Sequence, residues 1–132
     1  MRTSPKSRFQ AFTLVEVMIV VAIIAMLAAL ASSNLMRARK RAQAAKILDD
    51  LRLLDGALDQ YALEYNKTNG DTAEFTDLQP YLTLSSQMAI TGVDLFGQPY
   101  GPYAVDVGPK VSDFAFYALS DVAPASFWSP YK

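Results

Sequence analysis

The chain has 132 residues, no Cys and no His, and its 12 Lys and Arg against 13 Asp and Glu give a formal net charge of −1. This composition excludes disulfides, Cys/His zinc sites and catalysis by a thiolate or an imidazole, and it shows no overall charge bias toward nucleic acid. Glycine and proline divide the chain: residues 6–69 hold one Gly and no Pro, whereas residues 70–132 hold five Gly and six Pro. The division predicts a long uninterrupted helix followed by a turn-rich region.

The first 11 residues are polar and basic, and an apolar segment follows over residues 12–35. Its only polar residues are Thr13, Glu16, Ser32, Ser33 and Asn34. A helix of about 20 residues crosses the core of a bilayer, and a domain of this size has too little interior to bury a helix that is apolar on all sides. We therefore predict a membrane-inserted helix over 12–35.

Three kinds of membrane segment fit this pattern. An ordinary secretory signal would be cut after Ala31 and leave Ser32 as the mature terminus; a permanent anchor would not be cut; a third kind of signal is cut before the apolar segment. Three basic residues precede the segment and five follow it closely. Charge alone therefore leaves the orientation in the membrane undecided, because long domains translocate largely regardless of charge.

Glu16 distinguishes these interpretations, because a carboxylate within an apolar span is costly and is a candidate functional residue. It lies in the run Ala11-Phe12-Thr13-Leu14-Val15-Glu16, which continues into an apolar stretch through Ile24. This run resembles the N-terminal motif of type IV pilins and type II secretion pseudopilins. The resemblance implies that a prepilin peptidase cuts between Ala11 and Phe12 and methylates the new amine. It also implies that Glu16 pairs with the N-terminal amine of a neighbouring subunit during assembly.

Two positions depart from the pattern of that family. Ala11 stands where the family usually has Gly before the cut, so cleavage is expected to be slower. Ser33 stands where many members have Pro before the pair Asn34-Leu35, so a local helix break is less strongly favoured here.

The stretch 36–66 has the pattern of an amphipathic helix. Apolar residues spaced by 4, 3, 4, 3 and 4 lie on one face: Ile47, Leu51, Leu54, Leu58, Tyr61 and Tyr65. One helix is expected from Phe12 to Asn66, with this face packed on a small domain. Leu53 and Leu63 lie off the stripe and either contact neighbouring subunits or are simply exposed. The basic run 37–41 is interpreted as an anchor at the membrane surface rather than as a nucleic-acid patch.

The remaining residues, 67–132, predict a small turn-rich region. A turn at Asn69-Gly70-Asp71 is expected to end the helix, and residues 75–82 are expected to form a helical turn or loop. Residues 103–107 and 111–119 are expected to form strands, the second with Phe114, Phe116 and Ala118 alternating onto one face. The run 94–100, Asp-Leu-Phe-Gly-Gln-Pro-Tyr, resembles a stretch that enters the sheet of major pseudopilins. Phe127-Trp128 is expected to close the domain as an apolar lock. The predicted fold is therefore α+β and pilin-like, with a long helix packed on an antiparallel sheet of two to three strands.

No cofactor is expected. Related major pseudopilins often bind calcium in a C-terminal loop, but here Asp113 and Asp121 are the only carboxylates near that place, and a calcium ion usually takes six or more oxygens. An enzyme is disfavoured as well, because the chain has no nucleophile elbow, Walker loop or Ser-x-x-Lys motif. The pair Asp49-Asp50 is interpreted as solvated.

Together these features predict a chain with a leader (1–11), a transmembrane and filament-core helix (12–35), an amphipathic helical half (36–66) and a sheet and loop region (67–132). The resemblance implies a structural subunit of a bacterial secretion pseudopilus or pilus-like filament. Its partners would be its own copies, related minor pilins, the prepilin peptidase and inner-membrane assembly proteins. It would sit in the inner membrane with its C-terminal domain in the periplasm. The alternative is a small secreted or anchored binding domain with an ordinary signal.

Overall fold

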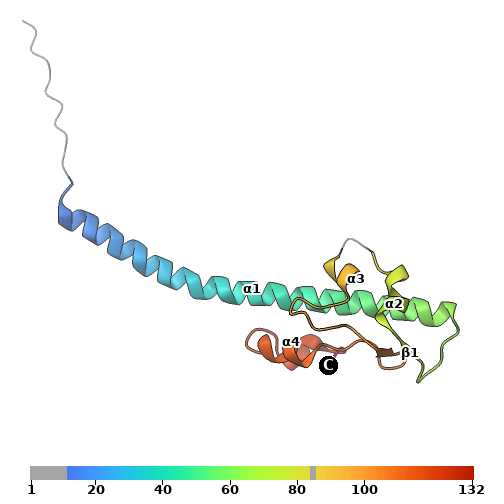
Figure 1. Cartoon of the computed structure of the whole chain (residues 1–132). Coiled ribbons are helices and arrows are strands. Elements are labelled where there is room, and N and C mark those ends of the chain that lie inside the picture. Colours follow the sequence, from blue (N-terminus) through green and yellow to red (C-terminus); the bar gives the residue numbers. More distant parts are fainter. Residues whose placement is uncertain (1–11, 84–85) are drawn as a thin grey trace, which may run out of the picture. The chain divides into compact units, whose positions relative to one another are not determined.

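The structure is a computed structural model that describes residues 12–83 and 86–132. One helix, α1, accounts for its first half (Figure 1). It runs over Leu14–Glu64 without interruption. The elements that follow are short: β1 (Thr72–Ala73), α2 (Phe75–Leu78), the 3-10 turn η1 (Gln79–Tyr81), α3 (Gln87–Thr91), β2 (Tyr103–Ala104), α4 (Asp113–Ala118) and the 3-10 turn η2 (Ala125–Trp128). The chain divides into two compact units, 1–36 and 37–132, and each is described by itself.

The first unit contains the N-terminal half of α1, whose side chains from Leu14 to Met36 are all exposed. Ser33, which stands where related chains often have Pro, lies inside the helix and donates a hydrogen bond from Oγ to the carbonyl of Leu30 at 3.4 Å. A serine bonded back to its own helix keeps the backbone ladder intact, whereas a proline would remove one of its bonds.

Within the second unit, the residues that follow α1 pack on one face of its residues 37–64, as predicted from the spacing of 4, 3, 4 and 3. Ile47, Leu51 and Leu54 have no exposed surface, and Leu58 is 1% exposed. The last residue of the predicted stripe, Tyr65, is instead 58% exposed, because α1 ends at Glu64.

The end of α1 lies earlier than the turn Asn69-Gly70-Asp71 had suggested. Asn66 takes the left-handed conformation (φ 48°), and the N–H of Lys67 donates to the carbonyl of Ala62 at 2.9 Å. Asparagine is the residue besides glycine that most readily adopts this conformation and stops a helix. Gly70 (φ 92°) therefore shapes the following turn and does not cap α1.

The sheet has two strands, the lower number of the predicted range. β1 and β2 run antiparallel, with Thr72 opposite Ala104 and Ala73 opposite Tyr103. Figure 1 shows the pair beside the C-terminal part of α1, in the same unit as α2, α3 and α4. The fold is thus α+β with a long N-terminal helix, as predicted.

The strand predicted over residues 111–119 is wrong, because residues 113–118 form the helix α4. The side chain of Ser112 caps this helix by accepting a hydrogen bond from the N–H of Ala115 at 3.2 Å. Val111, Ala115 and Leu119 are buried at intervals of four, which is the period of a helix. Phe114, whose alternation with Phe116 had suggested a strand, is 55% exposed.

The C-terminal residues close the core of the second unit. The side chain of Trp128 has no exposed surface, and the ring of Phe127 meets it edge-on at 5.1 Å between centroids. The backbone N–H of Val111 donates to the carbonyl of Tyr131 at 2.7 Å, so the last residues are also bonded to the chain that precedes α4. The predicted apolar lock at Phe127-Trp128 is therefore confirmed.

We predict that Leu54→Ala lowers the free energy of unfolding by about 2–5 kcal/mol, the range for removing a buried leucine side chain. Trp128 is the only tryptophan and is fully buried, so its fluorescence reports the unfolding of this unit in denaturant with the full chain in detergent. The matched control is Leu63→Ala on the same helix, where the side chain is 80% exposed and the expected change is within about 0.5 kcal/mol. Equal losses for the two variants would contradict the described core.

Candidate functional site

The start of α1 is arranged around Thr13. Its side-chain Oγ1 accepts a hydrogen bond from the N–H of Glu16 at 3.2 Å, and its carbonyl accepts from the N–H of Val17 at 3.3 Å. Thr13 thus caps the helix, and Glu16 occupies the third helical position, where the sequence Thr-x-x-Glu is typical of a capping box. Sequence reasoning missed this role, although Thr followed three residues later by Glu before an apolar run is a known signature.

Glu16 is exposed and makes no ion pair within residues 12–83 and 86–132. Its position in the first turn of α1 favours a carboxylate, because the N-terminal end of a helix carries partial positive charge. Phe12, the first described residue, is 78% exposed. Ala11 and the predicted leader 1–11 lie outside the described residues. A cation that pairs with Glu16 must therefore come from outside the described part of this chain.

The surface of α1 that follows Glu16 is apolar and uncovered. A window of 18 residues within the helix has a mean hydropathy of 2.8 and no buried residue, so by length and composition α1 could cross a membrane. Large side chains around the helix are each half exposed or more, among them Ile19, Val21, Ile24 and Leu27. A patch of this size marks a surface that lipid or other protein covers.

The run 94–100, predicted to stiffen the entry to a strand, forms a turn organised by Asp94. Its Oδ1 accepts from the N–H groups of Phe96 and Gln98, both at 2.8 Å, and its Oδ2 accepts from the hydroxyl of Ser112 at 2.9 Å. Asp94 is only 6% exposed, and Gly97 in the turn has a φ of 79°, which favours glycine. This carboxylate ties the turn to the cap of α4, a role that only the tertiary contact with Ser112 reveals.

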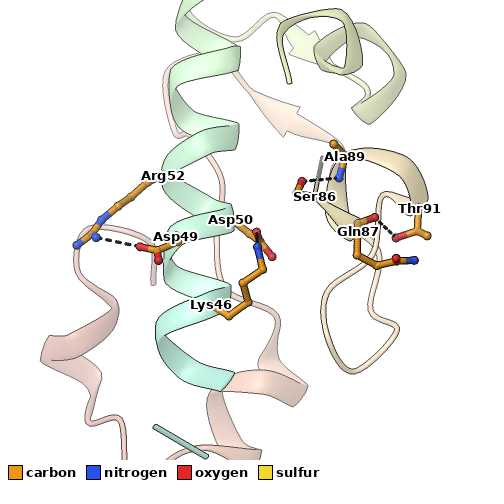
Figure 2. A network of polar contacts seen from close by, with 8 residues as sticks. All are labelled: Lys46, Asp49, Asp50, Arg52, Ser86, Gln87, Ala89 and Thr91. Carbon is orange, nitrogen blue, oxygen red and sulfur yellow. Dashed lines mark hydrogen bonds and ion pairs between the residues drawn. The ribbon is translucent and has the colours of Figure 1, made fainter. Parts of the chain in front are cut away.

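The acidic pair on α1, interpreted from the sequence as solvated, divides into two different environments (Figure 2). Asp49 is exposed and pairs with Arg52 at 3.3 Å, as interpreted. Asp50 is 2% exposed, so the interpretation is wrong for it, and Lys46 Nζ lies 2.7 Å from its Oδ1. Figure 2 also shows α3 beside this pair, capped by Ser86, whose Oγ accepts a hydrogen bond from the N–H of Ala89. Each carboxylate has an ionic partner on its own helix, which is a structural arrangement rather than an acid–base couple.

The two carboxylates considered for calcium, Asp113 and Asp121, have different surroundings. Asp113 lies in the first turn of α4, where a carboxylate is favourable at a helix N-terminus. Asp121 pairs with Lys40 at 3.0 Å, and this hydrogen bond lowers the pKa of the Asp121 carboxyl. Within residues 12–83 and 86–132, no three acidic side chains group closely enough to hold a metal ion.

Two tyrosine hydroxyls are buried beside β2. Tyr100 and Tyr103 are 6% and 5% exposed, and neither hydroxyl has a hydrogen-bond partner in the described part of the chain. Burial raises the pKa of both phenols, so both stay neutral at physiological pH. Both are core side chains.

Comparison with known proteins supports the interpretation of the N-terminal region. Residues 6–32 match the family described as the prokaryotic N-terminal methylation motif. The chain is 42% identical over 60 residues to the type II secretion system core protein G of Klebsiella pneumoniae, a match covering 46% of this chain and 43% of the relative. It is also 42% identical over 72 residues to the protein of that name from Escherichia coli K12, covering 52% of this chain and 48% of the relative.

The core protein G of Aeromonas hydrophila is similar to the same degree, 42% over 62 residues, or 47% of this chain and 43% of the relative. The matches thus span less than half the length of each of these relatives. No solved structure matches the chain significantly. The resemblance to type IV pilins and type II secretion pseudopilins, first noted from the run 11–16, is confirmed by these matches.

We predict that Asp94→Ala lowers the free energy of unfolding by about 2 kcal/mol, because two partly buried N–H groups and one partly buried hydroxyl lose their acceptor. The midpoint of denaturant unfolding, followed by Trp128 fluorescence, measures the loss. Asp59→Ala serves as the control, since Asp59 is an exposed carboxylate of α1 without a hydrogen bond in the described part of the chain. An unchanged midpoint for Asp94→Ala would show that the turn does not depend on this carboxylate.

Proposed function

We propose that this chain is a structural subunit of a type II secretion pseudopilus, or of a related type IV pilus-like filament, and that it polymerises through α1. One observation carries the proposal: an uncovered apolar helix begins with a single carboxylate, Glu16, inside a match to the N-terminal methylation motif. An ordinary signal peptide gives no reason for a carboxylate at this place. The similarity to core protein G of three bacteria supports the secretion pseudopilus in particular.

Processing is the first step of the proposed function. A prepilin peptidase cuts between Ala11 and Phe12 and methylates the amine of Phe12, so α1 stays on the mature protein. The exposed Phe12 and the capped first turn of α1 fit a chain whose helix begins at the new terminus. Removal of residues 1–11 takes away three positive charges and leaves 9 basic against 13 acidic residues, a net charge of −4.

Charge pairing is the second step. A carboxylate in hydrocarbon costs a few kcal/mol on insertion scales, and a buried amine carries a similar penalty. If Glu16 of one copy meets the Phe12 amine of the next, each charge offsets part of the other's desolvation. A copy that joins at the wrong height leaves both charges unpaired, so the pair sets the axial position of each new subunit.

The apolar part of α1 determines the location. We place it in the inner membrane as a single span, with the second unit, residues 37–132, in the periplasm. Its partners are then the prepilin peptidase, the inner-membrane assembly proteins, further copies of itself and related minor subunits. No catalytic role is part of the proposal, since the named relatives are core proteins of a secretion system.

We predict that Glu16→Gln and Glu16→Ala leave cleavage and the folding of the second unit unchanged but reduce polymer by at least about tenfold, since the axial pair is lost. Pelleting of polymer from cells that contain the assembly system measures the loss. Glu16→Gln keeps the size of the side chain and removes only its charge. Thr13→Ala is the matched control, because it removes the helix cap and keeps the carboxylate. Normal polymer from Glu16→Gln would defeat the charge-pair mechanism.

A further inference from the structure

The charges of α1 in the second unit are segregated along the helix. Five basic residues and no acidic residue lie between positions 37 and 46, whereas five acidic residues and one basic residue lie between positions 49 and 64. The basic residues are Arg37, Arg39, Lys40, Arg41 and Lys46, and the acidic ones are Asp49, Asp50, Asp55, Asp59 and Glu64. Twelve of the 13 acidic residues of the chain follow position 46, so a second copy offers the basic block an acidic surface.

The two blocks share a single spacing. Three basic residues are each followed by an acidic residue 18 positions later: Arg37 by Asp55, Arg41 by Asp59, and Lys46 by Glu64. Eighteen residues are five turns of an α-helix, so the two members of each pair lie at the same angle around α1. They are about 27 Å apart along the axis at about 1.5 Å per residue, so they cannot meet within one chain.

Arg41 and Asp59 are the pair that remains available. Both side chains are exposed, and within residues 12–83 and 86–132 neither makes an ion pair or a side-chain hydrogen bond. The acidic members of the other pairs have partners in their own chain: Asp55 accepts from the hydroxyl of Tyr131 at 3.2 Å, and Glu64 accepts from the hydroxyl of Tyr81. Lys46 holds the buried Asp50 (Figure 2).

The helix face beside this pair is uncovered and allows close approach. The core of the second unit occupies the face of Ile47, Leu51 and Leu54, and Arg41 and Asp59 lie at its border, because Leu48, two turns after Arg41, is only 8% exposed. On the uncovered face, Ala45 is small and exposed, and a Cβ added at Gly56 would meet no atom within 4 Å. Leu63, which is 80% exposed, lies on the same side, and its burial by another copy would exclude water from the charges.

We infer that this face of α1, from Arg41 to Leu63, is an interface between parallel copies of this chain that are shifted by about 27 Å along the helix axis. In this arrangement Arg41 of one copy contacts Asp59 of another. The inference rests on the proposed function, because a filament supplies the parallel neighbours. It adds a second axial contact, distinct from the one at Glu16.

The spacing favours parallel over antiparallel copies. In a parallel pair, a shift of 18 residues joins Arg41 to Asp59 and brings Arg37 level with Asp55, about 40° away around the helix, whereas Lys46 and Glu64 lie on another side of α1. In an antiparallel pair that joins Arg41 to Asp59, Arg37 would face Leu63 and Lys46 would face Leu54, which is in the core. An antiparallel dimer therefore satisfies one kind of pair only.

Disulfide trapping tests the shift directly, because the chain has no cysteine and any disulfide must come from introduced residues. In the full chain with Ala45→Cys and Leu63→Cys, two exposed positions 18 residues apart become thiols while every charge is kept. The thiols of one chain are too far apart to bond with each other. We expect oxidation of assembled polymer to give a ladder of covalent trimers and larger species. The control, Ala45→Cys with Leu53→Cys, should give no ladder, because its positions are 8 residues apart.

Charge reversal is the second arm. Asp59→Arg and Arg41→Asp should each reduce polymer at least about fivefold, because like charges then face each other between copies. The double variant Arg41→Asp/Asp59→Arg should restore it. Asp49→Arg is the matched control: it reverses an exposed acidic residue of the same helix that has Ala31 18 positions before it.

The outcomes separate this inference from the proposed function. If wild-type chain polymerises and Glu16→Gln does not, but the Ala45/Leu63 variant gives no ladder or stops at dimers, the shifted interface is wrong and the filament subunit stands. If Asp59→Arg and Asp49→Arg reduce polymer to the same extent, the specific contact between Arg41 and Asp59 is also wrong. If wild-type chain forms no polymer in the presence of the assembly system, both the function and the interface are overturned.

Discussion

The constraint on which the rest of the structure depends is the apolar surface of α1 from Leu14 to Met36, which no other described part of the chain covers. Fifteen large apolar side chains between Phe12 and Met36 are about half exposed or more. Burial of such a side chain is worth about 1.5–3 kcal/mol, so leaving all of them in water would cost more than about 20 kcal/mol, beyond the stability of an ordinary domain. In the proposed function, lipid covers this surface before assembly and other copies of the helix cover it afterwards, so the membrane location and the polymer would both follow from the same property.

The same helix serves two kinds of packing in its two halves. In residues 37–64 one face carries the core of the second unit, with Leu54 and Leu58 fully buried and Trp128 closing it from the C-terminal end. Arg41 and Asp59 lie at the border of this core face, beside the exposed side chains of Ala45 and Leu63. A domain that covers one side of its helix leaves the rest of the helix for neighbouring copies. The segregated charges along α1 offer an axial register between such copies, which an apolar surface alone does not define.

Sequence reasoning predicted the structure correctly where a periodic pattern extended over a long segment, and it failed where the segment was short. The stripe from Ile47 to Tyr61 spans several turns, so its spacing defines the core face of α1. The segment 113–118 is short enough for alternation of Phe114 and Phe116 to mimic a strand, although the cap at Ser112 was visible. The role of Asp94 could not be predicted, because it depends on a contact with Ser112 that the fold creates. The assembly role of Glu16 stays a prediction, and the cap by Thr13 adds a local reason for a carboxylate at this place.

The most direct test of the central claim, that α1 remains on the mature protein and carries its assembly charge, is the intact mass and N-terminal residue of the protein extracted from membranes of cells that contain a prepilin peptidase. We predict a chain that begins at Phe12 and carries one methyl group on its amine. A chain that begins at Ser32, without α1's apolar half, would contradict the claim. So would a full-length chain that still begins at Met1 and yet polymerises.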